Sequence, residues 1–477
     1  MNHLHTNKFY INGFWVQPDG TDTLDVINPE TEKSIASIAM GSAKDVDNAV
    51  AAAKEAFQHF SKTTKEERLQ LLEKILEVYE RRSDEMSQII TAELGSPISL
   101  SINAQTVVGS GHLKATIETL KSFEFEETNS EGDLIIRDAI GVCGLITPWN
   151  WPMNQIALKV FPALAVGCTM VLKPSEVTPL NALLFAEILD EAGVPAGVFN
   201  LVNGEGAIVG STLSNHEDVQ MMSFTGSTRA GTLITKDAAD TVKKVTLELG
   251  GKSPNIILPD ADLTAAISRG IKHCFQNTGQ SCNAPTRMLI HESQYEEAIA
   301  IAATIALETK VGSPSQKGGH IGPLASEMQF NKVQALIEIG IKEGADVLVG
   351  GLGKPEGFET GYFVKPTIFI NVNNDMAIAR EEVFGPVLVM IPYKSEEEAI
   401  AIANDTPYGL AAFIQAGDVE KAKSVMRSLR AGMVRINGTD IGYASPFGGY
   451  KLSGNGREGG LLGLEDFCEV KAVSYPK

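Results

Sequence analysis

Between Ala139 and Leu249, short apolar runs alternate with helix-like segments, and this alternation restricts the possible folds more than any other feature of the chain. Strands and helices that take turns form parallel βαβ units, with helices covering both faces of the sheet. The strands are predicted at 141–147, 169–173, 198–202, 219–225 and 244–249. The helices between them are predicted at 153–166, 179–192, 206–213 and 228–239. Ligands of such sheets bind at the carboxyl ends of the strands, so we expect a site there.

A second α/β series follows Gly250. It begins with a strand at 255–258, a helix near 262–276 and a strand near 286–291. A chain of 477 residues is longer than the size at which single cores stop growing, so two or more domains are expected, with a boundary near Gly250. The Gly-rich stretch 446–460 carries aromatic and charged side chains, and we expect it to be ordered and not a linker.

The segments outside these two series are also patterned. Apolar residues recur at helical spacing over 44–57 and again over about 65–82, where Thr63 and Glu66 fit a capping box. Residues 123–138 alternate as a β-hairpin does. These features predict packing and carry no information about function.

Charge and cysteine content limit the possible partners. The 40 basic and 59 acidic side chains give a net charge of −19, and the resulting field disfavours nucleic acid and anionic membranes. No apolar stretch reaches 18 residues, and the N-terminal sequence lacks the pattern of a signal peptide, so neither a membrane span nor secretion is expected. No two of the five cysteines form a CxxC motif, which favours reduced thiols and a cytoplasmic location.

Several common signatures are absent. GEGAIVG (204–210) is one residue too long for the dinucleotide fingerprint, and GSTRAGTL (226–233) lacks the Lys-Ser/Thr of a phosphate-binding loop. No HExxH or GxSxG motif occurs, and the eight histidines form no cluster, so no metal site is predicted.

Two turns at predicted strand ends allow either a functional or a plain structural interpretation. In FTGSTRAG (224–231), the backbone N–H groups at a helix start can bind a pyrophosphate, but an ordinary tight β–α turn has the same sequence character. In KPSE (173–176), Lys173 and Glu176 can reach a nucleotide lying over the sheet, or they can form a solvated loop.

Cys282 is placed differently from the other four cysteines. It lies in NTGQSCNAPTR (277–287), a polar and loop-like setting, whereas the others lie among apolar or small residues. A thiolate in such a setting can attack a carbonyl carbon. No histidine base lies nearby in the sequence, so the residues alone leave the nucleophile interpretation open.

Taken together, seven segments closely resemble the aldehyde dehydrogenase superfamily, in the family's order and over nearly the whole chain. They are PWNWP (148–152), KPSE (173–176), FTGSTRAG (224–231), LELGGKSP (247–254), GQSC (279–282), EEVFGPV (381–387) and PFGGYKLSGNGRE (446–458). The resemblance implies an α/β fold with a Rossmann-like cofactor domain, a second α/β catalytic domain and a small β oligomerisation element. The implied ranges are 1–120 and 140–250 for NAD binding, 251–450 for catalysis, and 121–139 with 460–477 for oligomerisation.

The resemblance also implies a mechanism, the oxidation of an aldehyde to the acid with NAD(P)+. Cys282 would attack the aldehyde carbon, and the side-chain amide of Asn150 with the backbone N–H of Cys282 would hold the oxyanion. Glu248 would activate the water that hydrolyses the thioester and help to deprotonate the thiol, which accounts for the missing histidine.

Further residues are carried over from the family as cofactor ligands, with NAD as the cofactor and NADP possible. Lys173 and Glu176 would bind the adenosine ribose, Gly226 and Ser227 the pyrophosphate, and Glu382 the nicotinamide ribose, with Phe384 near the ring. The remaining expected cofactor contacts are Thr147, Trp149, Gly206 and Leu249. Glu382 and Phe384 can alternatively be buried loop anchors, and Lys159 matches a family position with a partly structural role.

The matching positions for the substrate line a tunnel. They are Trp151, Gln155, Leu158, Ile441 and Phe447. Leu158 stands where many relatives have a tryptophan, which predicts a wide and mainly apolar pocket with no fixed charge for a substrate carboxylate. The resemblance implies a small-molecule aldehyde as substrate. The hairpin and the C-terminal tail match the family's oligomerisation element, which implies a homodimer or homotetramer.

Two alternatives to hydrolytic oxidation fit the sequence less well. In a CoA-acylating relative, CoA and not water resolves the thioester, but such relatives generally lack the glutamate found here at position 248. A binding or structural protein that lost catalysis, as some lens proteins did, would not be expected to retain Asn150, Glu248, Cys282 and Glu382 together.

Overall fold

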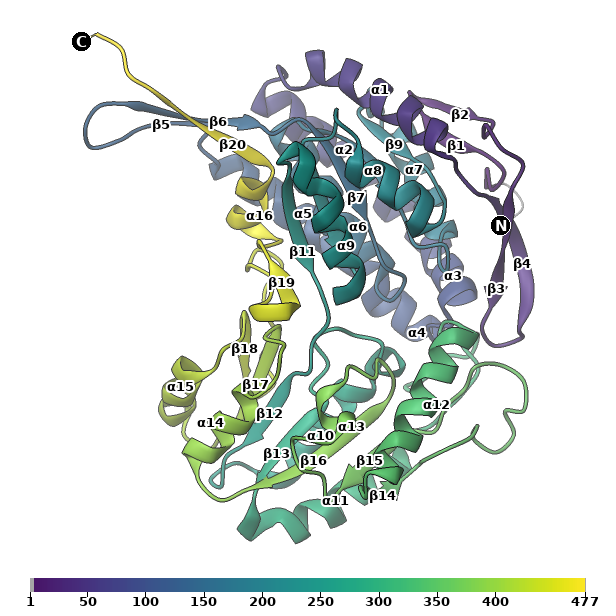
Figure 1. The fold of residues 1–477 in the computed structure, drawn as a ribbon, viewed down its shortest axis with the longest axis vertical. Coiled ribbons are helices and arrows are strands. Elements are labelled where there is room, and N and C mark those ends of the chain that lie inside the picture. The colour runs from purple at the N-terminus through teal and green to yellow at the C-terminus, as the bar shows by residue number, and fades with distance from the viewer. Residues whose placement is uncertain (1–3, 477) are drawn as a thin grey trace.

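The computed structural model describes residues 4–476 and contains two large sheets, each covered by helices on both faces (Figure 1). The first three residues of the predicted cofactor domain and the last residue of the predicted tail lie outside this range. The alternation predicted from the sequence is confirmed in both halves of the chain. Within residues 4–476, none of the helices combines the length and the apolar character that a bilayer crossing requires.

The first sheet has eight strands. Their spatial order is β19 (Gly454–Asn455), β11 (Lys244–Glu248), β10 (Met221–Thr225), β7 (Val142–Ile146), β8 (Thr169–Lys173), β9 (Phe199–Leu201), β1 (Phe9–Ile11) and β2 (Phe14–Val16). The five strands from β11 to β9 run parallel, so their carboxyl ends share one edge. β19 lies in the Gly-rich stretch and pairs with β11 of the first sheet, which confirms that this stretch is ordered.

Two helical layers bury this sheet. One face carries the first of them, which consists of α1 (Ala43–Phe60), α8 (Ser211–Asn215) and α9 (Thr228–Ala238). The other face carries α6 (Pro152–Val166) and α7 (Leu180–Glu191), backed by α2 (Lys65–Arg81), α3 (Ser83–Leu94), α4 (Ile98–Leu100) and α5 (Val107–Ser122). The double thickness on this side explains why every residue of α6 except Asn154 is buried.

Two local predictions differ from the structure by small shifts. The capping box of α2 uses Thr64 and Glu67, one residue beyond the predicted Thr63 and Glu66, because Thr64 is the residue whose extended backbone lets its hydroxyl accept the Glu67 N–H. The helix predicted at 206–213 is a π-helical turn, Gly206–Gly210, that continues into α8.

The second sheet has seven strands and its own helices. Their order is β14 (Asp346–Val349), β15 (Thr367–Ile370), β16 (Val387–Tyr393), β13 (Arg287–His291), β12 (Pro254–Ile257), β17 (Ala411–Gln415) and β18 (Met433–Ile436). One face packs on α10 (Leu263–Phe275) and α11 (Tyr295–Glu308). The other packs on α12 (Glu327–Lys342), α13 (Ala377–Arg380), α14 (Glu396–Asn404) and α15 (Val419–Ser428).

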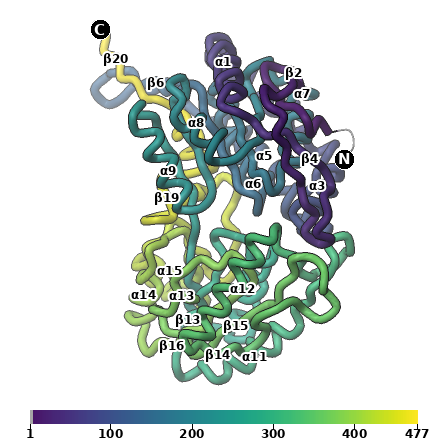
Figure 2. The backbone as a smooth tube through the Cα atoms, turned by 45° about the vertical axis from the view of Figure 1, so that its right-hand side comes forward, coloured from purple at the N-terminus to yellow at the C-terminus, as the bar shows by residue number. Residues whose placement is uncertain are grey.

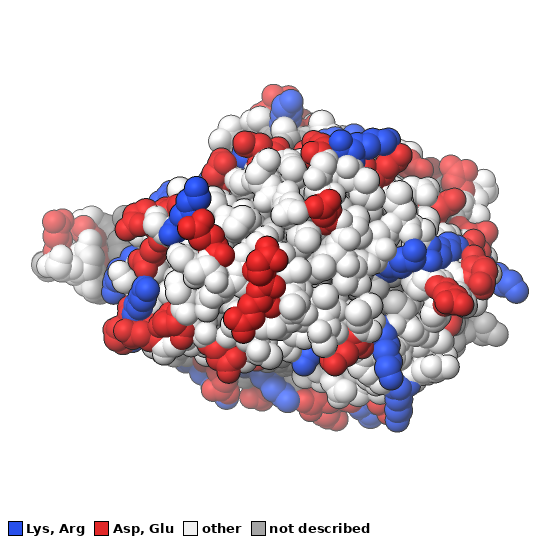
Figure 3. Space-filling view, turned by 90° about the horizontal axis from the view of Figure 1, so that it is seen from below, with Lys and Arg blue, Asp and Glu red and all other residues white. Residues whose placement is uncertain are grey.

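Two small sheets complete the fold. β3 (Thr23–Asn28) and β4 (Lys33–Ala39) form a hairpin beside α3. The predicted hairpin is confirmed as β5 (Glu126–Thr128) and β6 (Leu134–Ala139), and β20 (Cys468–Val473), which follows α16 (Gly460–Asp466), pairs with β6. These three strands form an arm that projects from the body (Figures 1 and 2). Seen from below, the face formed by the second sheet's helices shows Lys and Arg side chains scattered among acidic ones, with no continuous basic surface (Figure 3).

Candidate active site

The Cys282 side chain stands between two cavities. One, of about 170 Å³, is lined by nine predicted site residues: Trp149, Asn150, Gly226, Ser227, Glu248, Leu249, Cys282, Glu382 and Phe384. The other, of about 270 Å³, is lined by Cys282 and all five predicted substrate residues, Trp151, Gln155, Leu158, Ile441 and Phe447. Among the described residues, Cys282 alone lines both. We call them the cofactor-side and the substrate-side cavity.

A strained turn presents the thiol. Asn277, Thr278 and Gly279 have φ angles of 52°, 57° and 71°, three consecutive left-handed residues directly before the Cys282 loop. Left-handed backbone is costly for non-glycine residues and persists only where surrounding contacts hold it. Here Asn277 Nδ2 donates to the Asn150 carbonyl oxygen at 2.9 Å, and Thr278 Oγ1 donates to the Gly322 carbonyl oxygen at 3.1 Å. The turn therefore fixes the sulfur at the junction of the cavities.

The amide of Asn150 is held beside this turn. Its Nδ2 donates to the Gln280 carbonyl oxygen at 3.0 Å, and the side chain is 3% exposed. A carboxamide nitrogen carries two hydrogens, so a second donor remains for a ligand in the cofactor-side cavity.

Glu248 ends strand β11 and points into the cofactor-side cavity without a partner. It is 3% exposed, and neither carboxylate oxygen accepts a hydrogen bond from a described residue. Burial raises the pKa of Glu248 well above its ordinary value, and the neighbouring Glu458 carboxylate raises it further. Gly448, with a φ of 151°, leaves room for this side chain, because a Cβ there would lie 2.6 Å from Glu248 Oε1.

A buried ion pair lies beside Glu248. Lys159, which is 0% exposed, pairs with Glu458 and donates to Ser223 Oγ at 3.2 Å. The Lys159 charge lowers the pKa of Glu248 and so opposes the effect of Glu458. Neither partner was expected from the sequence to act in catalysis. A lysine in the middle of an apolar helix was nevertheless a usable signal, because a buried cation needs a buried anion.

The surroundings of the thiol disfavour its ionisation in the resting state. Burial raises the pKa of Cys282 above its usual range, and the Glu382 and Glu248 carboxylates raise it further. The backbone N–H groups of Cys282 and Asn283 act in the opposite direction. A thiol held protonated in this way needs a base at the moment of attack.

The wall opposite the thiol is built by Glu382 and Phe384. Glu382 Oε1 accepts the Gly251 N–H at 3.0 Å, which leaves Oε2 free, and burial raises the pKa of this carboxyl. Phe384 has a φ of 59° and packs edge-on against Trp149 at 5.3 Å between ring centroids. Gln329, which the sequence did not indicate, fixes this strained residue by donating to the Phe384 carbonyl oxygen at 2.8 Å.

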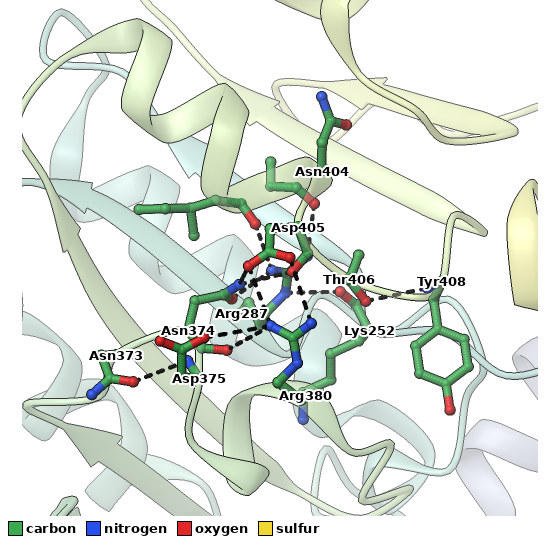
Figure 4. A network of polar contacts seen from close by, with 12 residues as sticks. Lys252, Arg287, Asn373, Asn374, Asp375, Arg380, Asn404, Asp405, Thr406 and Tyr408 are labelled. Carbon is green, nitrogen blue, oxygen red and sulfur yellow. Dashed lines mark hydrogen bonds and ion pairs between the residues drawn. The ribbon is translucent and has the colours of Figure 1, made fainter.

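A network of polar contacts within residues 252–408 holds the loop that follows Glu248 (Figure 4). Arg287, which is fully buried at the start of β13, donates to the carbonyl oxygens of Lys252, Ile402 and Ala403 at 2.8–3.0 Å. It thereby ties the strand after Cys282 to the loop after Glu248. Lys252 is buried beside it, and burial lowers the pKa of Lys252 to about 7. Neither residue was singled out from the sequence.

Four predicted cofactor residues lie outside the cofactor-side cavity. Thr147 and Lys173 are buried at the ends of β7 and β8, and Lys173 Nζ donates to Glu176 Oε2 at 3.2 Å. Gly206 is exposed at the start of the π-helical turn, with open space where a Cβ would point. β8 lies two strands from β10 along the shared edge, so these residues continue the line of the cavity along the first sheet.

The residues along this edge suit a dinucleotide. Thr225 Oγ1 is buried without a partner beside the cavity, and Glu382 Oε2 is free to accept from hydroxyls. Helix α9 begins at Thr228, behind the N-cap Ser227, and the first N–H groups of a helix attract phosphate oxygens. Within residues 4–476, no group of three or more His, Cys, Asp or Glu side chains is arranged to hold a metal ion.

The prediction of a substrate pocket without fixed charge is wrong. The substrate-side cavity is lined by Arg435 and Asp440 in addition to the predicted residues, and by the polar side chains of His112, Asn154 and Tyr443. Arg435 lies on β18, in register with Phe413 of β17. The sequence could not reveal this, because the polar lining comes from elements more than 300 residues apart that only the fold brings together.

Comparisons with known proteins agree with this geometry. Residues 15–473 match the model of the aldehyde dehydrogenase family. A 3-succinoylsemialdehyde-pyridine dehydrogenase from Pseudomonas sp. is 53% identical over 467 residues, which are 98% of each chain. The crystal structure of an aldehyde dehydrogenase from Bartonella henselae has a TM-score of 0.97 and 54% identity, covering 98% of this chain and 99% of that one. Aldehyde dehydrogenase C of Pseudomonas syringae, crystallised as a mutant with NAD+ and octanal, has a TM-score of 0.97 and 49% identity, covering 98% and 97%.

Proposed function

The chain belongs to the aldehyde dehydrogenase family and oxidises an aldehyde to the carboxylic acid with NAD+, and we propose that Cys282, Asn150 and Glu248 carry out the chemistry. The observation that carries the assignment is the position of Cys282 between the two cavities, with the unpartnered Glu248 carboxylate in one of them. A nucleophile that faces both a cofactor space and a substrate space is what a transfer between the two requires.

In the first step, Cys282 Sγ attacks the aldehyde carbon, a C–S bond forms, and the carbonyl oxygen becomes an oxyanion. The free N–H of Asn150 Nδ2 and the backbone N–H of Cys282 are the donors for that oxyanion, and each such donor contributes roughly 3 kcal/mol in a water-poor site. NAD+, when bound, supplies the acceptor for the hydride that leaves this carbon, and a thioester on Cys282 results. The thiol proton goes to Glu248, whose raised pKa makes it a stronger base than an ordinary carboxylate.

Hydrolysis completes the cycle. Glu248 first releases the thiol proton to solvent and then accepts a proton from water as the resulting hydroxide attacks the thioester carbon. The C–S bond breaks to release the acid, and Glu248 returns its proton to the departing Cys282 thiolate. The free oxygens of Glu248 in the cofactor-side cavity favour water over CoA as the acceptor. Formation of an acyl-CoA in product analysis with CoA present would contradict this.

The proposed cofactor contacts follow the edge of the first sheet. Glu382 binds the nicotinamide ribose beside Phe384, Ser227 and Gly226 the pyrophosphate at the start of α9, and Glu176 with Lys173 the adenosine ribose. Trp149, Leu249, Thr147 and Gly206 line or support the same path. The Glu176 carboxylate would repel a 2′-phosphate, so NAD+ is preferred; equal kcat/KM with NADP+ would contradict this preference.

We propose a matching division of the chain. Residues 1–120 and 140–250 bind the cofactor, residues 251–450 carry the nucleophile, and residues 121–139 with 460–477 assemble a homodimer or homotetramer. The arm presents β20 as an edge strand with Val470 67% exposed, and such an edge invites pairing with a second chain. A monomeric mass by light scattering would contradict the assembly. A cytoplasmic location is part of the same proposal.

The substrates named for the relatives suggest a medium-sized aldehyde. Octanal and a pyridine-bearing semialdehyde both have a body several atoms long behind the aldehyde. We propose that the substrate-side cavity, with Trp151, Leu158, Ile441 and Phe447 in its walls, accepts aldehydes of that length, with Gln155 as a polar contact.

The test is NADH formation at 340 nm across an aldehyde panel. Cys282→Ala is expected to lower the rate on the order of a thousandfold or more, because no other group supplies the covalent step. NAD+ binding, measured by calorimetry, should be unchanged. Residual oxidation above a few per cent in this variant would overturn the assignment.

A further inference from the structure

The substrate-side cavity changes character from one end to the other. Around the sulfur it is apolar, because Cys282 packs with Ile441 and Phe447 against one hydrophobic cluster. At the other end it adjoins a larger cavity of about 790 Å³, and His273, Gln276, Arg435 and Asp440 line both. Cys282 does not line the larger cavity, so Arg435 marks the end remote from the reacting sulfur.

The Arg435 guanidinium has one ion-pair partner among the described residues, Asp440, and the contact is long. Its side chain is 21% exposed, and it donates no hydrogen bond to any residue among 4–476. The nearest carboxylate oxygen, Oδ1 of Asp440, lies 3.6 Å away on a side chain that is 94% exposed. Arg269 in the same larger cavity differs, because it donates two hydrogen bonds to Gln415 Oε1 at 2.8 and 3.1 Å. A guanidinium has five N–H donors, and leaving them unmet in a partly buried place is costly.

The charge around Arg435 favours an oxygen acceptor over a cation. Burial lowers the pKa values of His112 and His273 to about 4, so both rings are neutral near pH 7. The Lys, Arg, Asp and Glu side chains that line the larger cavity are Arg269, Lys272 and Arg435 against Glu308 and Asp440, an excess of one positive charge (three against two). In a chain of net charge −19, this is a locally positive entrance.

We propose, on the basis of the function above, that the preferred substrate is an aldehyde bearing an acceptor oxygen remote from its reacting carbon, and that Arg435 binds this oxygen. The apolar neck at Cys282 accommodates the methylene chain, while Arg435 receives the far end. A carboxylate is the oxygen group that the positive entrance favours most, and a ketone oxygen offers the same hydrogen-bonding chemistry with less charge attraction.

A matched substrate series tests the proposal. We would compare kcat/KM for hexanal, 6-oxohexanoate and 5-oxohexanal in the unaltered enzyme and in Arg435→Met. A hydrogen bond to a charged group contributes an amount equivalent to about 10- to 100-fold in kcat/KM. In Arg435→Met, kcat/KM for 6-oxohexanoate should therefore fall by about that factor, and kcat/KM for 5-oxohexanal should fall by less. The kcat/KM for hexanal should change by less than about threefold. Arg435→Lys should recover part of the loss on the carboxylate.

Two further variants separate contact from general charge. Lys272→Met removes a cation from the larger cavity only, so its effect should be small and should vanish in high salt, whereas the effect of Arg435→Met should persist. Asp440→Asn removes the competing carboxylate and should raise kcat/KM for 6-oxohexanoate modestly. An equal loss on all three substrates in Arg435→Met would overturn the proposal, as would turnover of hexanal by the unaltered enzyme with no preference for an oxygenated substrate. The latter result would leave the oxidation of aldehydes itself intact.

Discussion

Two buried carboxylates, Glu93 and Glu248, have opposite hydrogen-bonding environments. Glu93 on α3 is fully buried and accepts three hydrogen bonds, from the Leu180 and Asn181 backbone N–H groups and from Asn181 Nδ2, at 2.7–2.9 Å. Glu248 at the end of β11 is 3% exposed and accepts none. Burial raises the pKa of both, to about 7 for Glu93 and well above the ordinary value for Glu248.

The two buried carboxylates therefore have different roles. Glu93 supplies the acceptors that the first N–H groups of α7 lack, and so it joins two helices. Glu248 leaves its lone pairs unused, at a cost in folding free energy, and they face a cavity that holds Cys282. A buried acid without donors is unfavourable for stability but suited to accepting a proton. Three sets of variants, at Glu248, at the Lys159–Glu458 pair and at Glu93, can break or sharpen this contrast.

The largest expected effect is that of Glu248→Gln. General-base catalysis contributes about 10²- to 10⁴-fold, so thioester hydrolysis should slow by a factor in that range. If Glu248 acts only on water, NADH should form in a burst equal to the enzyme concentration and then nearly stop, and mass spectrometry should find the acyl group on Cys282. If Glu248 also accepts the thiol proton, the burst itself should slow.

The Glu248→Gln result has a control and a clear contrary outcome. Glu93→Gln alters the other buried acid and should leave the burst and the steady rate unchanged. In the unaltered enzyme, the steady rate should rise with pH through the raised pKa of Glu248, because only the ionised carboxylate accepts a proton. A Glu248→Gln enzyme that keeps a steady rate within twofold of the unaltered one would remove Glu248 from the mechanism.

The second effect concerns the charges behind Glu248. The Lys159 ammonium lowers the pKa of Glu248 and the Glu458 carboxylate raises it. Lys159→Met should therefore move the acid limb of the pH profile of kcat to higher pH, and Glu458→Gln should move it to lower pH. The double variant should fall between them. Ser223→Ala removes a hydrogen bond of Lys159 without a charge and serves as the matched control.

An effect on stability can be told apart from an effect on the pKa of Glu248 by the direction in which the acid limb of the pH profile moves. Loss of one partner leaves a buried charge unpaired, so both single variants should lower the midpoint of urea unfolding. A general loss of structure would lower kcat at every pH, whereas the electrostatic account requires two shifts of opposite direction. Identical shifts in the two variants would contradict it.

The same contrast shows which residues of the site could be predicted from the sequence and which could not. Asn150 follows a predicted strand, Glu248 lies near the end of another, and Cys282 lies in a polar loop, so their positions could be expected from local pattern and from resemblance. Lys159 and Glu458 are 299 positions apart, and no local pattern states that they meet. The roles of Glu93 and Arg435 depend on the packing of helices and on strand register, which the fold alone determines. The cofactor-side residues were thus accessible from motifs, while the charged end of the substrate-side cavity was not.

The smallest effect on turnover, and the most direct test of the structural acid, is expected at Glu93. A folded pKa of about 7, raised from 4.5, means that the folded state holds a proton more tightly than the unfolded chain. The stability from this proton is fully present below pH 4.5 and is lost as the pH rises through 7, a change of roughly 3 kcal/mol. Glu93→Gln keeps an acceptor oxygen and cannot ionise, so its urea midpoint should vary less between pH 6 and 8. Glu93→Ala leaves the three donors unmet and should lower the free energy of unfolding by about 2–4 kcal/mol, with a kcat within about twofold of the unaltered enzyme. Equal pH dependence in Glu93→Gln and the unaltered protein would show that the three hydrogen bonds hold Glu93 ionised throughout, and the contrast with Glu248 would then rest on hydrogen bonding alone.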